Sequence, residues 1–325
     1  MKIDVQCHFY PEKVIEKLKA RSAAPTAMDK NGRTVIMAGR HTGLSFPPAI
    51  NDLDAKLGAM DAAGVDVQVL SINVPGPELA GGQEADDLAE LAHDCLAELI
   101  QKQPDRFWGM ACLGLGDMDR SLKELDRCLN DLGFKAVQLY SNLRGTPLDD
   151  PSLHPLYERC AELDLPIFLH PTVPVLSEEP MADYGLIPIV GFLFDTTLAA
   201  LRLIMSGTMK KFPDVKFVLP HVGSTIPYLM GRIDFLTSSM PNGREHLDGE
   251  APSEFFKRFY FDTVSSYQPA IDYFYKLYGA DGLLFGSDHP WVEIDSCVDL
   301  VEGLPADEAE KEKIYSKNAL ALLRN

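Results

Sequence analysis

Short apolar runs alternate with longer amphipathic stretches along the whole chain. Each run is rich in β-branched or aromatic residues, which is typical of a buried strand. We therefore predict eight strands, at residues 2–8, 65–72, 107–115, 134–140, 165–170, 215–221, 258–264 and 282–288.

The stretches between these runs predict helices. Residues 85–102 repeat apolar positions at i, i+3, i+4 and i+7, which places them on one helical face. Residues 121–133 follow the same pattern and end at a glycine suited to a helix C-cap. The other predicted helices lie within residues 152–164, 197–212 and 227–236.

Eight strands that alternate with helices predict an α/β fold, a closed parallel (β/α)8 TIM barrel, over a single domain of residues 1–325. An open, doubly wound sheet is the structural alternative. The absence of a glycine-rich phosphate loop after the first predicted strand makes that alternative weaker.

Two segments interrupt the alternation. Residues 22–51 are rich in Pro, Gly and Thr and contain a strand-like run at 34–37. We interpret them as a small insertion after strand one, a hairpin near the mouth of the site. Residues 171–188 form a long loop after the fifth strand, and loops at the carboxyl ends of barrel strands commonly shape the pocket.

Metal-competent side chains fall at the ends of four predicted strands: His8, His170, His221 and Asp288. A single histidine at a strand end more often caps a strand or lies at the surface. Four such residues on one predicted catalytic face favour a shared site, since imidazole and carboxylate suit a catalytic Zn²⁺ or a similar ion. Gln6 lies two residues before His8 and is expected to project in the same direction.

Several motifs occur in an order that resembles a known family: residues 1–11 (MKIDVQCHFYP), 60–71 (MDAAGVDVQVLS), 168–171 (FLHP), 221–234 (HVGSTIPYLMGRID), 260–263 (YFDT) and 285–291 (FGSDHPW). Together they resemble the amidohydrolase-2 family, in its branch of 2-amino-3-carboxymuconate-6-semialdehyde decarboxylase-like enzymes. The resemblance extends from Ile3 to Trp291. It is specific for the family and weakly specific for any substrate.

This resemblance implies a divalent metal, Zn²⁺ with Mn²⁺ as the alternative, held by His8, His170 and Asp288. It implies a catalytic or water-orienting role for His221. We expect Asp288 to carry a proton in addition to its role as a ligand. At Gln6 the family usually has His or Glu, so Gln6 is an uncertain fourth ligand.

The resemblance also suggests substrate-binding residues. Arg232 corresponds to an arginine that binds a substrate carboxylate, sometimes across a dimer interface; a surface ion pair with Asp234 is the alternative. Where the family often has Arg, this chain has Lys56, which either attracts a carboxylate or is a solvated helix residue. The remaining candidates adjoin the motifs: Phe9, Tyr10 and Trp291 as an aromatic wall, with ordinary packing as the alternative, and His289 beside Asp288.

The function implied is removal of CO₂ from an aromatic or unsaturated carboxylic acid without an organic cofactor. Hydrolysis of a lactone, ester or amide, or hydration of a double bond, on the same site is the alternative, because a metal can also activate water. A catalytically eroded scaffold is a third hypothesis, which rests on Gln6.

Composition and charge restrict the classes of binding partner and the compartment. The formal net charge of −18 argues against nucleic acid and anionic membranes, which need basic patches, and does not exclude an anionic substrate. The small-molecule carboxylic acid substrate is implied by the resemblance. The six cysteines are scattered, with no C-x-x-C pair, as expected of free thiols in a reducing cytoplasm. Neither a signal peptide nor a long apolar span is visible. The resemblance further implies a homodimer.

Overall fold

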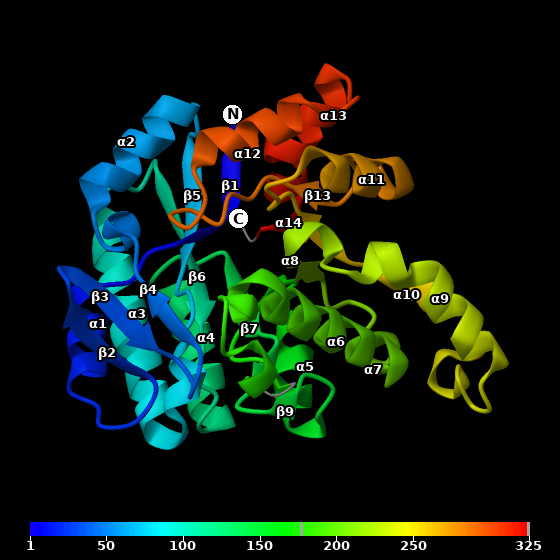
Figure 1. The fold of residues 1–325 in the computed structure, drawn as a ribbon, viewed down its shortest axis with the longest axis horizontal. Coiled ribbons are helices and arrows are strands. Elements are labelled where there is room, and N and C mark those ends of the chain that lie inside the picture. Colours follow the sequence, from blue (N-terminus) through cyan, green and yellow to red (C-terminus); the bar gives the residue numbers. More distant parts are fainter. Residues whose placement is uncertain (176–177, 324–325) are drawn as a thin grey trace.

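The computed structural model describes residues 1–175 and 178–323. Within these ranges, eight parallel strands form one sheet in chain order, and helices surround it (Figure 1). The strands are β1 (Ile3–His8), β5 (Val67–Ser71), β6 (Phe107–Cys112), β7 (Ala136–Tyr140), β10 (Ile167–His170), β11 (Phe217–Leu219), β12 (Tyr260–Asp262) and β13 (Leu283–Leu284).

The last strand returns to the first. A parallel bridge joins Cys7 to His289, and the amide of Val5 donates to the carbonyl of Phe285 at 2.9 Å. All eight predicted strands are present, and the predicted barrel is confirmed. The eighth is paired over only two residues, so Asp288 lies on the turn that follows β13.

The helices between the strands are α1 (Glu12–Lys19), α2 (Leu53–Ala63), α3 (Gly82–Lys102), α4 (Met118–Asn130), α5 (His154–Glu162), α6 (Phe192–Met205), α7 (Thr208–Lys211), α8 (Pro220–Gly223), α9 (Ile226–Ser239), α10 (Pro252–Phe256), α11 (Gln268–Tyr278), α12 (Ile294–Glu302), α13 (Glu308–Glu312) and α14 (Asn318–Leu322). Every predicted helical stretch overlaps one of them. Local signals set their ends: Asp52 accepts from the amide of Ala55 at the start of α2, and Gly64, with φ of 65°, ends it.

Alternate strand residues fill the barrel interior at its amino end. Ile3, Val5 and Phe168 belong to this inner cluster, and α14 covers it with Ala319 and Leu322. A larger apolar cluster lies between the strands and the outer helices. Because the interior is packed at one end, polar side chains at the carboxyl ends of the strands face the other end.

The insertion after β1 is an antiparallel sheet of β2 (Thr26–Lys30), β3 (Arg33–Met37) and β4 (Gly43–Ser45). It contains the predicted strand-like run and has one strand more than the predicted hairpin. A second small hairpin, β8 (Asn142–Leu143) and β9 (Thr146–Pro147), follows β7.

One apolar helical stretch in the described residues, Ile187–Met205, has the length and composition of a membrane span. It begins with a π-helical turn at Ile187–Gly191 and continues as α6. Half of its most apolar window is buried inside the protein, as in a core helix.

Candidate metal centre and cavity

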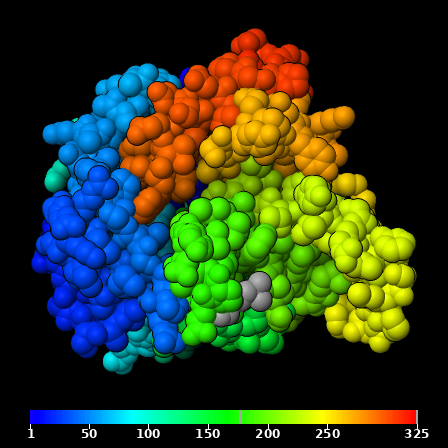
Figure 2. Space-filling view, viewed as in Figure 1, coloured from blue at the N-terminus to red at the C-terminus, as the bar shows by residue number. Residues whose placement is uncertain are grey.

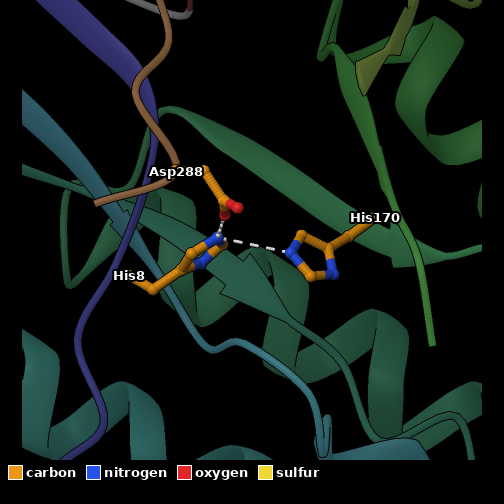
Figure 3. Close-up of side chains that lie close together, drawn as sticks. All are labelled: His8, His170 and Asp288. Atoms are coloured by element: carbon orange, nitrogen blue, oxygen red, sulfur yellow. Dashed lines mark hydrogen bonds and ion pairs between the residues drawn. The ribbon is translucent and has the colours of Figure 1, made fainter. Parts of the chain in front are cut away.

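Three predicted ligands converge at the carboxyl end of the barrel (Figure 3). The Nε2 atom of His8 lies 3.0 Å from Oδ1 of Asp288 and 3.3 Å from Nε2 of His170. The residues come from β1, from β10 and from the turn after β13, so the fold brings together positions up to 280 residues apart.

The Nδ1 atoms of His8 and His170 form hydrogen bonds outside this cluster. The hydroxyl of Ser71 donates to the carbonyl of Cys7, so it accepts from Nδ1 of His8 at 3.0 Å. Nδ1 of His170 donates to the carbonyl of Pro171 at 2.7 Å. These partners assign the proton of each ring to Nδ1 and leave both Nε2 lone pairs directed at one another.

This arrangement fits a divalent cation. Burial lowers the pKa of both His8 and His170 to about 3, so the rings are neutral bases at pH 7. Two lone pairs and a carboxylate oxygen within hydrogen-bonding distance repel one another unless a positive charge lies between them. Metal–ligand bonds of about 2.1 Å would separate such donors by about 3.0–3.4 Å, which matches the distances found.

Backbone strain accompanies the site. Asp288 and His221 have φ of 61° and 57°, in the left-handed region that non-glycine residues rarely adopt. The carboxylate of Asp262 at the end of β12 accepts from the amides of His221 and Val264, at 2.7 and 3.0 Å. Asp262 therefore holds the backbone that carries His221.

A closed ring of buried hydrogen bonds encloses the Asp288 segment. Lys56 Nζ lies 2.9 Å from Nδ1 of His289 and 3.3 Å from the amide oxygen of Gln68. Gln68 donates to Asp4, Ser287 donates to Asp4, and the amide of His289 donates to Ser287, at 2.8, 2.6 and 3.0 Å. We call this set the Lys56 ring: Lys56, Gln68, Asp4, Ser287 and His289.

A cavity of about 910 Å³ opens beside the cluster and is lined by His170, His221 and Asp288. Its walls are largely apolar: they include Leu44 of the insertion, Phe192 and Leu193 of α6, Phe274 of α11, and Val264, Tyr267 and Trp291. Figure 2 shows the insertion, the segment before α6 and the segment around α12 meeting near the middle of one face (blue, green and orange). The expected position of the insertion near the mouth agrees with Leu44.

Five predicted substrate-binding residues lie outside the lining of this cavity, four of them in the interior of the protein. Phe9 and Tyr10 are packed in the apolar core, where the hydroxyl of Tyr10 donates to the carbonyl of Pro75. Lys56 is completely buried, so its alternative as a solvated helix residue is wrong; its amine reaches inward to His289, which is also buried. Only Trp291 of the predicted aromatic wall lines the cavity, and Phe46 packs against it.

The positions of Arg232 and Gln6 differ in part from those expected. Arg232 is exposed on α9, which extends from the edge of the barrel (Figure 1), and it forms no ion pair with Asp234 in the described structure. Arg232 follows Tyr228, which lines the cavity, by one helical turn. Gln6 is buried, and its side-chain nitrogen has no partner among the described residues.

Sequence reasoning missed two buried acids. Burial raises the pKa of Asp262 and of Glu78 to about 8. Glu78 accepts from Thr172, two residues after His170, at 3.1 Å, and its second oxygen has no partner in the described structure. The position of Asp262 at a strand end was the available signal for it. Glu78 had none, because it lies in a short 3-10 helix (Pro77–Ala80) that carries no periodic pattern.

A second histidine cluster lies away from the barrel mouth. His93 accepts from the amide of Cys112 and contacts Glu124 at 2.7 Å, and Arg127 also pairs with Glu124. Both ring nitrogens of His93 have hydrogen-bond partners and Arg127 pairs with the carboxylate, so neither is free to bind a metal. We interpret this cluster as a contact that joins α3 to α4.

A parallel barrel with two imidazoles and a carboxylate at the carboxyl ends of its strands defines the class of metal-dependent barrel enzymes. The chain belongs to the amidohydrolase family, whose sequence model matches residues 3–324. The predicted family is therefore confirmed.

Relatives and solved structures agree with this membership. The chain is 34% identical over 289 residues to gamma-resorcylate decarboxylase from Polaromonas sp., covering 83% of this chain and 87% of that one. The crystal structure of 5-carboxyvanillate decarboxylase from Sphingomonas paucimobilis is similar with a TM-score of 0.85 and 25% identity, over 99% and 98% of the two chains. A dihydroxybenzoic acid decarboxylase from Polaromonas sp., solved with bound manganese and 2-nitroresorcinol, has a TM-score of 0.79 and 28% identity, over 99% and 96%.

Proposed function

We propose that the protein is a metal-dependent, non-oxidative decarboxylase of an aromatic carboxylic acid. The observation that carries the proposal is the convergence of His8, His170 and Asp288, with two unshared imidazole lone pairs, at the wall of an apolar cavity. The relatives support the reaction, since those described above are named as decarboxylases of aromatic acids.

His8, His170 and Asp288 would hold the divalent ion, and Gln6 remains an uncertain fourth ligand. The ion supplies Lewis-acid stabilisation of negative charge on the substrate when it is bound. The manganese-containing relative supports a divalent metal, and we propose Zn²⁺ or Mn²⁺ here. Elemental analysis of the purified protein decides between them.

Residues at the cavity would carry out bond cleavage and protonation of the substrate. When the bond to the carboxylate breaks, CO₂ leaves and the electron pair stays on the ring carbon, which must then take up a proton. Asp288, ionised while it faces the ion, would take up the proton of a substrate hydroxyl group and pass it to that carbon, so the net charge of the site does not change. His221, whose pKa burial lowers, is neutral at pH 7 and orients the carboxylate. The apolar walls exclude water from the carbanionic carbon.

A panel of hydroxybenzoates, assayed for CO₂ release, tests this proposal. Asp288→Asn should lower kcat by at least about 100-fold, whereas the exposed Asp214→Asn should leave it unchanged. Turnover of lactones or esters with no CO₂ from any aromatic acid would establish the hydrolase alternative. Absence of both activities and of bound metal would establish the eroded scaffold.

We further propose a homodimer whose interface is the exposed apolar surface beside the cavity mouth. Large apolar side chains beside it are exposed, among them Ile189, Phe194, Tyr228 and Tyr267, at 61%, 48%, 85% and 65%. Such clustered exposure is typical of an interaction surface. Light scattering should give twice the chain mass, and Tyr228→Lys should reduce it; a monomeric wild type would refute the assignment.

The six free cysteines, five of them buried, support placement in a reducing compartment, and we propose the cytoplasm. Fractionation of the native cell checks this. Recovery of the protein in an oxidising compartment would contradict it.

A further inference from the structure

We propose that the substrate carries a single carboxylate, with the rest of the molecule uncharged and largely apolar. This inference rests on the proposed function and deepens it. The substrates in the names of two similar proteins differ in their number of carboxylates: gamma-resorcylate has one, whereas 5-carboxyvanillate has two. The charges around the cavity distinguish the two classes.

The first step is the charge of the lining. Among the described residues that line the cavity, none is lysine or arginine, and Asp288 is the one carboxylate. The imidazoles of His170 and His221 also line it. Imidazoles bind a metal as neutral bases, so they add no charge.

The second step is the charge balance. A divalent ion and the Asp288 carboxylate leave a net charge of one positive unit in the site. One substrate carboxylate neutralises this charge. A second carboxylate would be buried among apolar walls without a partner, which is strongly unfavourable.

The third step concerns the cations around the cavity, none of which belongs to its lining in the described structure. Lys56 is buried and directed at His289 and Gln68, away from the cavity. Arg40 of the insertion is exposed and pairs with Glu179. Arg232 is exposed beyond the cavity wall on α9. Within the described part of the chain, no cation reaches the space where a second carboxylate would lie.

The fourth step is the size and polarity of the space. A cavity of about 910 Å³ lies near the upper end of the range for drug-sized ligands, about 300–1,000 Å³, so one unsubstituted ring leaves much of it empty. Phe192, Leu193, Tyr267 and Phe274 suit alkyl or aryl substituents. The polar groups on the wall, Asn73, Ser224, Ser265 and Ser266, suit neutral hydroxyl groups. The substrate class is therefore a hydroxylated aromatic monocarboxylate with apolar ring substituents.

A matched pair of acids tests the inference: an alkyl-substituted salicylate, and the hydroxyisophthalate that has a second carboxylate in place of the alkyl group. We expect kcat/KM for the dicarboxylate to be at least about 100-fold lower. Calorimetry should rank two unreactive analogues in the same way, when a sulfonate replaces the reacting carboxylate and keeps its negative charge: the analogue with the additional carboxylate should bind more weakly. Equal or better turnover and binding of the dicarboxylate compounds would overturn the inference.

A gain-of-charge variant sharpens the test. Ser266→Arg places a cation at the exposed rim and should improve dicarboxylate binding relative to the monocarboxylate by about tenfold, whereas the uncharged Ser266→Gln should not. If wild type prefers the dicarboxylate and Arg232→Ala abolishes that preference, a second copy of the chain supplies the missing cation and the inference is wrong. Absence of CO₂ release from every acid would refute the proposed function, while the calorimetric comparison still decides the charge class.

Discussion

Replacement of Lys56 by methionine tests whether the Lys56 ring positions Asp288. Lys56 lies outside the cavity, but its amine closes the ring of hydrogen bonds around the segment 287–289. Methionine has a similar length and is apolar, so Lys56→Met removes the amine without a large cavity. The segment then loses one of the contacts that hold Asp288 at a φ of 61°.

The magnitude follows from the bonds that are lost. Nδ1 of His289 and the amide oxygen of Gln68 become buried acceptors without a donor, at about 1–3 kcal/mol each, so stability should fall by roughly 2–6 kcal/mol. Loss of a group that orients a metal ligand typically weakens metal binding about 10–100-fold, or about 1.4–2.8 kcal/mol.

The assay is the dissociation constant for Mn²⁺ or Zn²⁺, measured on folded protein well below its unfolding midpoint. Leu96→Ala on α3 is the matched control, because it removes a completely buried side chain and costs a similar stability of about 2–5 kcal/mol. We expect weaker metal binding in Lys56→Met alone. Equal metal affinity in the two variants would refute the positioning role and leave the Lys56 ring as a purely structural feature.

Three further substitutions test the buried groups around the site. Burial raises the pKa of Glu78 from 4.5 to about 8, so the folded protein keeps a proton that the unfolded chain loses in this range, and stability falls as pH rises from 4.5 to 8. Glu78→Gln should remove that dependence, at most roughly 3 kcal/mol between urea titrations at pH 5.5 and 8.5; an unchanged pH slope would contradict it. Gln6→His should slow metal loss on dialysis if Gln6 faces the ion, and unchanged metal retention places Gln6 elsewhere. His221→Asn should lower kcat by about 100-fold or more at unchanged metal content, and a near-normal kcat would remove His221 from the reaction.

The site was predicted in part because barrel geometry converts strand ends into neighbours. His8 and His170 end β1 and β10, and Asp288 follows β13, so recognising the strands was sufficient to bring the three together. The same logic placed His221 at the cavity, although a turn with positive φ, held by Asp262, carries it there.

Other residues could not be assigned from the sequence, because their roles depend on the direction of a side chain. Lys56 lies on α2, and only the packing of α2 against the barrel directs its amine inward. Phe9 and Tyr10 adjoin the proposed ligand His8 in sequence but face the apolar core. Arg232 follows the cavity-lining Tyr228 by one turn and still points to solvent.

The sequence by itself determined the alternation of strands and helices, because apolar periodicity is a local property that each segment carries independently. It also determined the acidic charge and the set of donors at the strand ends. The tertiary structure decided which donor atoms point toward one another, in which buried acids the pKa is raised, and which side chains line the cavity. These properties depend on distance and burial between segments far apart in the chain, and only the closed barrel fixes them.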